Sequence, residues 1–139
     1  MAWTRYKGNK GNKYGNVKVE RDGVKFDSKL ERTMYDMLKK FKIPFDFQVT
    51  EELQPPFRDS TGKAIIRITA IVDFVIDIDG KRLYVDTKGE ATQVAIVKYK
   101  ILNYREHLKK SNYEIIWLAT KKDVNNFVID LYDKINNNK

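Results

Sequence analysis

The sequence predicts a mixed α/β domain in which a central β-sheet is flanked by helices. Three observations predict it. Apolar residues recur at helical spacing in residues 27–41 and 121–135. Residues 64–89 are rich in β-branched and aromatic residues and contain Asp79-Gly80, a strong hairpin signal. Strands and helices then alternate along the chain, which is typical of a sheet with helices packed on it.

The expected element order is β-β-α-β-β-β-α-β-α. The segments, in chain order, are a hairpin at 16–26, a helix at 27–41, a strand at 44–53, a loop at 54–63, strands at 64–78 and 81–88, a helix at 91–110, a strand at 113–119 and a helix at 121–135. Ser28 is a good cap for the first helix. No linker divides residues 16–139, so we expect them to form a single domain.

The charge balance indicates a polyanionic partner. The chain has 27 basic and 19 acidic residues and a net charge of +8, and nucleic acid is the usual partner of such a protein. The absence of cysteine and the single histidine exclude disulfides, zinc fingers and a Cys–His nucleophile. We expect that histidine, His107, to lie on the surface. No apolar run suits a membrane span or a secretory signal, so we expect a cytoplasmic protein.

Residues 1–15 are expected to form a flexible basic tail. They are rich in glycine and asparagine and cannot pack a core. Four cations lie among aromatic residues and suit contacts with phosphates, namely Arg5, Lys7, Lys10 and Lys13. A tail without any role is the alternative.

The stretch "YVDTKGE" contains the most informative residues of the chain. If Asp79 and Gly80 form a two-residue turn, Asp77 faces Arg82 and Phe74 faces Val85 across the hairpin. The same register places Asp73 opposite Asp86. A slip by one residue would mix the apolar and polar faces.

Two opposed carboxylates repel each other unless one is protonated or a cation lies between them. Oxygen ligands suit Mg²⁺ or Mn²⁺. Lys88 follows Asp86 on the same face and can reach a water or a phosphate. Asp73, Asp86 and Lys88 therefore predict a metal-dependent phosphodiester site, with a pair of solvated acids as the alternative.

Glu31 is the candidate for a third acid. It begins the first helix, close behind Ser28. The alternative is a capping box, in which the Glu31 carboxylate accepts a hydrogen bond from the Ser28 backbone N–H. The two roles are compatible.

These residues resemble the PD-(D/E)xK nuclease superfamily. The resemblance is carried by "FDSKLE" at a helix start, "IVDF" in a strand and "YVDTKG" at a strand end. Within the superfamily the chain is similar to the phage-type endonuclease I Holliday junction resolvases. It is more similar still to a family of small phage proteins regarded as resolvases, over residues 13–109. "KYGNVKVERDGVKFDSKLE" and "VDTKGEATQV" carry this closer likeness.

The resemblance implies a restriction-endonuclease-like fold and four catalytic positions, at Glu31, Asp73, Asp86 and Lys88. Asp73 and Asp86 would hold Mg²⁺, for which Mn²⁺ can substitute. The carbonyl of Thr87 and Glu31, directly or through water, would complete the ligands. The chain departs from the motif at Val72, where the superfamily name has proline, and at Asp86, where many members have glutamate.

The resemblance further implies a Mg²⁺-dependent endodeoxyribonuclease that resolves branched DNA, with no small-molecule cofactor. It would act as a homodimer in a bacterial or phage-infected cell, and the apolar faces of residues 30–41 and 113–135 are candidate interfaces. Lys98, Lys100 and Arg105 would lie near DNA, unless they form a solvated basic face. A restriction-type or nicking endonuclease, an RNA substrate and a non-catalytic DNA-binding protein are the alternatives.

Overall fold

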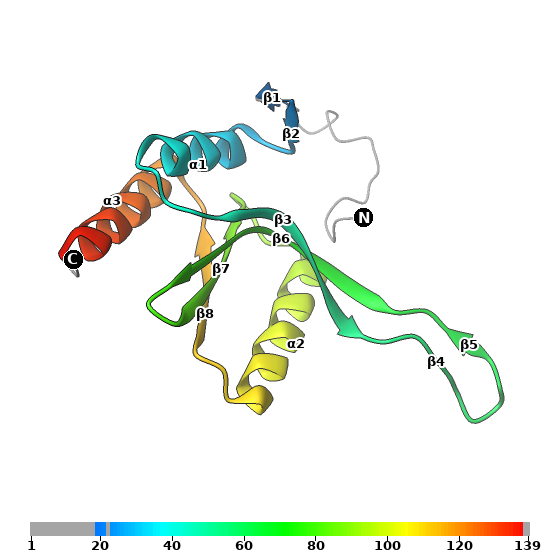
Figure 1. Ribbon diagram of the computed structural model, residues 1–139. Coiled ribbons are helices and arrows are strands. Elements are labelled where there is room, and N and C mark those ends of the chain that lie inside the picture. Colours follow the sequence, from blue (N-terminus) through cyan, green and yellow to red (C-terminus); the bar gives the residue numbers. More distant parts are fainter. Residues whose placement is uncertain (1–18, 22, 138–139) are drawn as a thin grey trace.

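A four-stranded sheet forms the centre of the domain in the computed structural model (Figure 1). The structure describes residues 19–21 and 23–137. The elements are β1 (Val19–Arg21), β2 (Val24–Phe26), α1 (Lys29–Lys40), β3 (Asp46–Gln54), β4 (Phe57–Arg58), β5 (Ala64–Ile65), β6 (Ile68–Ile78), β7 (Lys81–Thr87), α2 (Gln93–Lys109), β8 (Tyr113–Leu118) and α3 (Lys121–Asn137). The sheet order is β3-β6-β7-β8. Only the β7–β8 pair is parallel, and α2 connects these two strands. The predicted mixed α/β class, with a sheet flanked by helices, is confirmed.

The core lies in two layers, one on each face of the sheet. Helices α1 and α3 cover one face, with Met34, Leu38 and Val128 fully buried against Phe74 and the alternate residues of β7. Helix α2 covers the other face. Its buried residues Ala95, Tyr99 and Leu102 pack on Val75 and Tyr84. Alternation along β6 and β7 therefore supplies both layers from one hairpin, as the sequence pattern predicts.

The apolar faces expected to form a dimer interface are used by this core instead. Along α1, Met34, Tyr35 and Leu38 are buried, and along α3 Val124 and Val128 are buried. The two helices pack on each other because each has an apolar stripe that the sheet alone does not cover. The prediction that residues 30–41 and 113–135 expose free apolar faces is wrong for most of those residues.

The loop expected at residues 54–63 is a second correction. Residues 57–58 form β4, which pairs with β5, so residues 57–65 form a short ribbon beyond the sheet. Ile66 and Arg67 separate β5 from β6. The strand expected from Ala64 onward is therefore two strands, because β5 pairs locally with β4 while β6 pairs with β3.

The predicted register of the β6–β7 hairpin is confirmed for five pairs, from Ile78↔Lys81 to Phe74↔Val85. The sixth expected pair, Asp73 with Asp86, is not part of the ladder. The pairing of β3 with β6 is also interrupted there, between Phe47↔Phe74 and Val49↔Val72. Asp73 therefore lies at a local irregularity on both sides of β6.

Gln48 is the source of this irregularity. Its φ is 52°, a left-handed conformation that non-glycine residues rarely adopt within a strand. Phe47 packs in the core layer of α1, whereas Val49, two residues later, packs in the layer of α2. The strand pair thus changes faces at Gln48. The change brings Asp73 to the place where both layers meet.

The left-handed conformation gives a stability prediction. We expect Gln48→Val to lower the free energy of unfolding by about 1–2 kcal/mol, because a β-branched side chain clashes with its own backbone in this region. Thr50→Val, at an exposed position of the same strand, should change it by less than about 0.5 kcal/mol. Denaturant unfolding of both variants measures the difference. Equal effects would contradict a special backbone at Gln48.

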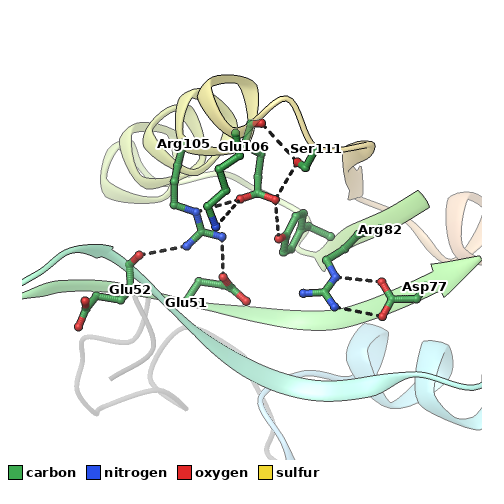
Figure 2. A network of polar contacts seen from close by, with 9 residues as sticks. Glu51, Glu52, Asp77, Arg82, Arg105, Glu106 and Ser111 are labelled. Carbon is green, nitrogen blue, oxygen red and sulfur yellow. Dashed lines mark hydrogen bonds and ion pairs between the residues drawn. The ribbon is translucent and has the colours of Figure 1, made fainter. Parts of the chain in front are cut away.

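A polar network fastens the C-terminal half of α2 to the sheet (Figure 2). Glu106 is 4% exposed and accepts hydrogen bonds from Arg105 Nε (3.0 Å), Tyr84 Oη (3.2 Å) and Ser111 Oγ (3.0 Å). Arg105 also donates to Glu51 Oε1 (2.7 Å). Burial acts to raise the pKa of Glu106, but the bonds from Ser111 and Arg105 outweigh it, so the pKa is lowered. The charged form of Glu106 therefore stabilises the fold.

Removing this carboxylate should be costly. We expect Glu106→Ala to lower the free energy of unfolding at neutral pH by about 2–4 kcal/mol, because Tyr84 and Arg105 lose a buried acceptor. Asp77→Ala is the matched control, since its ion pair with Arg82 is exposed and worth less than about 1 kcal/mol. Denaturant unfolding measures both. A control as destabilised as Glu106→Ala would contradict the role of the network.

Candidate active site

Three acidic side chains from three elements are buried close together. Glu31 comes from the first turn of α1, Asp73 from β6 and Asp86 from the end of β7. Their exposed fractions are 1%, 8% and 0%. Acidic residues are almost never buried to this degree without partners or a function.

Asp73 is held at the end of β7. Its Oδ2 atom accepts hydrogen bonds from the Thr87 backbone N–H (2.9 Å) and the Thr87 hydroxyl (3.0 Å). These bonds replace the regular ladder that the sequence predicted between Asp73 and Asp86. They leave Asp73 near enough to Asp86 for the two charges to interact.

Glu31 combines capping with a position in the acid cluster. Its backbone N–H donates to Ser28 Oγ (3.1 Å), as the capping-box alternative predicts. The reciprocal bond differs, because Glu31 Oε1 accepts from the backbone N–H of Asp27 (2.6 Å) and not from that of Ser28. The second oxygen, Oε2, is buried without a hydrogen bond. One carboxylate oxygen thus caps the helix entry, and the other is left for the site.

Burial raises the pKa of Glu31 to about 9, and the neighbouring charge of Asp73 adds to the shift. Burial also raises the pKa of Asp86 well above its usual value, again with Asp73 adding to it, while Lys88 opposes the shift. Both oxygens of Asp86 are buried and accept no well-formed hydrogen bond. The surroundings of the cluster therefore disfavour the charged forms of Glu31 and Asp86 when no cation is bound.

Lys88 is positioned through its main chain. Its N–H donates to the Leu118 carbonyl (3.0 Å), and its carbonyl accepts from the indole Nε1 of Trp117 (2.9 Å). The side chain is half-buried and near enough to Asp86 to favour its charged form. The parallel strand β8 thus fixes the residue that follows β7.

Sequence reasoning missed three residues of this site, Thr87 as a side chain, Tyr99 and Trp117. Tyr99 is 8% exposed, and its pKa is raised well above the usual value by burial and by Asp86 and Asp73. Tyr99 packs edge-on against Trp117, at a centroid distance of 5.7 Å. From the sequence, both aromatic residues look like ordinary core residues, Tyr99 of a helix and Trp117 of a strand. No local signal separates them from the other apolar residues.

The oxygen atoms fit a hard divalent cation. Glu31 Oε2 and both Asp86 oxygens are buried and accept no well-formed hydrogen bond, and Mg²⁺ prefers carboxylate oxygen. Among residues 23–137, no group of three or more His, Cys, Asp or Glu side chains is arranged to hold a metal ion as it stands. The fit therefore rests on the Asp73–Asp86 pair, which matches the one or two carboxylates that Mg²⁺ commonly takes from a protein.

The basic residues expected to contact DNA have different surroundings. Lys100 is exposed. Lys98 is half-buried, and burial lowers its pKa. The prediction that Arg105 contacts DNA is corrected, because its guanidinium donates hydrogen bonds to Glu51, Glu106 and the Glu52 carbonyl within the fold (Figure 2). The four tail cations Arg5, Lys7, Lys10 and Lys13 lie outside the described residues.

The fold and site define a class, a mixed α/β protein with a buried acid cluster and a lysine where two central strands meet. The chain belongs to the family described as "Protein of unknown function (DUF1064)", which matches residues 11–126. It matches none of the curated proteins and none of the solved structures compared with it. In the described part of the chain, no helix is long and apolar enough to cross a membrane.

The raised pKa values predict how stability depends on pH without metal. Between about pH 4.5 and about pH 9 the folded protein keeps a proton on Glu31 that the unfolded chain releases. The free energy of unfolding in EDTA should therefore fall as pH rises through this window. Asp86→Asn should raise the free energy of unfolding at neutral pH, because it removes a carboxyl whose charged form is disfavoured by burial. Each pKa unit of such a shift corresponds to about 1.4 kcal/mol.

Denaturant unfolding across this pH range measures both effects. Asp130→Asn, at an exposed position of α3, is the control and should leave the profile of the parent protein unchanged. A profile that rises with pH in EDTA, or an Asp86→Asn variant less stable than the parent at neutral pH, would contradict the raised pKa values of Glu31 and Asp86.

Proposed function

We propose that this chain is a Mg²⁺-dependent DNA endonuclease of the PD-(D/E)xK type, selective for branched DNA such as Holliday junctions. One observation carries the proposal: a helical acid, a hairpin acid and an acid-x-Lys end come together as Glu31, Asp73, Asp86 and Lys88. These are the four positions of the motif that the sequence resembles. A chain with a net charge of +8 suits a phosphodiester polymer as substrate.

The arrangement of elements supports a restriction-endonuclease-like core. Each acid lies at a point where the fold limits its freedom: the first turn of α1, the position of β6 where the ladder is interrupted, and the end of β7, which pairs with β8. Because three separate elements meet there, the acids are held in place by the core. A site built on regular elements keeps its geometry better than one built on loops.

In this mechanism Asp73 and Asp86 would hold Mg²⁺, and the buried Oε2 of Glu31 would reach it directly or through a water. Mg²⁺, when bound, lowers the pKa of a water and neutralises charge on the phosphate. The Thr87 hydroxyl and N–H hold one Asp73 oxygen and so orient the other. The Lys88 ammonium stabilises the negative charge that develops on the phosphate oxygens or orients the attacking water.

The raised pKa values of Glu31 and Asp86 indicate that the folded chain by itself does not compensate their charged forms. A divalent cation, together with Lys88, would compensate the negative charge of the ionised acids and of a bound phosphate. Two copies of the site would be needed to cut both strands of a junction symmetrically, so a two-fold homodimer is part of the proposal.

Cleavage by site variants tests the proposal. With Mg²⁺ the purified protein should cut a four-way DNA junction, and Asp73→Asn or Asp86→Asn should remove cleavage while leaving junction binding intact. Lys88→Ala should lower turnover by roughly 10²- to 10³-fold, which is the usual cost of losing one group that stabilises transition-state charge. Gel assays of cutting with Mg²⁺, and of binding with Ca²⁺, measure the two separately.

Asp130→Asn provides a folded control with the same change in charge, and it should cut like the parent protein. A linear duplex with the same arm sequences separates structure selectivity from a restriction-type or nicking activity, because the latter would cut both substrates equally. The matching RNA junction tests for RNA. Full activity of Asp73→Asn or Asp86→Asn would reject the site, and an inactive parent protein that still binds would favour a non-catalytic DNA-binding protein.

A further inference from the structure

Residues 55–67 form a narrow arm that projects from the sheet. It contains β4 and β5 and continues the paths of β3 and β6 beyond the body of the domain (Figure 1). No helix covers it in the part of the chain that the structure shows. The arm makes no contribution to either layer of the core.

The arm is nevertheless ordered by its own hydrogen bonds. Asp59 Oδ1 accepts from the Thr61 N–H (2.8 Å), the Thr61 hydroxyl (2.7 Å) and the Lys63 N–H (3.0 Å). Arg58 donates to the Gly62 carbonyl (2.9 Å), and Gln54 donates to the Ile66 carbonyl (3.2 Å). An ordered projection that has no core of its own indicates a segment that contacts a binding partner of the domain.

The surface of the arm is basic and apolar. Arg58, Lys63 and Arg67 are exposed, and Arg67 has only a long ion pair with Glu52 (3.8 Å). Phe57 is 49% exposed and Ile66 82% exposed. The carboxylate of Asp59, the one acid of the arm, accepts the hydrogen bonds of the turn, and these bonds lower its pKa. Such a surface complements a partner that is anionic along its edges and apolar between them.

The arm leaves the sheet from the same end at which the acid cluster lies. Strand β6 starts next to the arm and reaches Asp73 five residues after Ile68, and β7, which runs the opposite way, ends at Asp86 and Thr87. At about 3.3 Å per residue, Ile68 lies at most about 17 Å from Asp73 and Gly62 at most about 36 Å. One turn of duplex DNA is about 34–36 Å long.

We propose that the arm lies along a groove of a nucleic acid duplex whose phosphate is bound at the acid cluster, about 5–10 base pairs from that phosphate. This inference rests on the proposed function. A two-stranded ribbon fits the major groove, its cations face the phosphates, and its apolar side chains contact base edges. A second copy of the chain is a poorer occupant, because it brings another net charge of +8 against a basic arm.

Binding to junctions with branches of two lengths tests the proposal. The protein is used with Ca²⁺ in place of Mg²⁺, so that binding is measured without cleavage and the acid cluster keeps its cation, on branches of about 5 and about 16 base pairs, one shorter and one longer than the reach of the arm. The arm variant carries Arg58→Gln, Lys63→Gln and Arg67→Gln. The matched control carries Lys121→Gln, Lys122→Gln and Lys134→Gln, three exposed positions of α3 with the same loss of charge.

The arm variant should bind the long-branched junction more weakly. The slope of its log affinity against log salt concentration should be smaller by about 2.7, because each of the three lost phosphate contacts removes about 0.9 from that slope. On the short-branched junction the arm variant and the control should bind alike. Ile66→Ala should weaken only long-branch binding and leave the salt dependence unchanged. Circular dichroism and the melting temperature check that each variant is folded.

Equal loss on both branch lengths, or the same loss in the α3 control, would overturn the inference. Arm variants that change the sedimentation of the protein but not its DNA affinity would replace the duplex by a second copy as the occupant. These outcomes are distinct from failure of the proposed function, in which the parent protein binds or cuts no DNA. A parent protein that cuts junctions, with an arm variant that binds all of them normally, rejects the arm alone.

Discussion

The burial of three mutually repelling acids is the constraint on which the rest of this structure depends. Glu31, Asp73 and Asp86 would separate if they lay on flexible segments, because proximity and burial both disfavour their charged forms. They stay together because α1, β6 and β7 are anchored by the apolar core. The free energy of that core offsets the cost of the cluster, which is a common arrangement at sites that act on charged ligands.

Each neighbour of the cluster restricts one acid. Thr87 donates to one oxygen of Asp73, and the backbone N–H of Asp27, just before α1, donates to one oxygen of Glu31. Tyr99 lies against Asp86 from α2, on the opposite side of the sheet from α1. Because Gln48 turns β3 at this point, a residue of β6 can meet both layers. A backbone conformation with a local cost thus shapes the candidate site.

The charges of the molecule fall into two groups. Arg105, Glu51 and Glu106 are paired within the fold, where they tie α2 to the sheet and bond the hydroxyl of Tyr84. The cations of the arm and Lys100 remain exposed to solvent. Buried acids that need a cation in order to ionise, together with the exposed cations of the arm, fit the phosphate polymer that we propose as the ligand.

The sequence by itself determined the class of fold, most element positions and the hairpin register, because apolar periodicity and the Asp79-Gly80 turn are local signals. It also determined the candidate acids and Lys88, since their types and spacing carry the chemistry. Only the tertiary structure decided that Asp73 bonds Thr87 instead of pairing with Asp86, and that Arg105 is internal. It alone showed that Tyr99 and Trp117 lie at the site. It also showed that the segment expected to be a loop is part of the two-stranded arm. These features depend on contacts between segments far apart in the chain, and no local pattern of residues records such contacts.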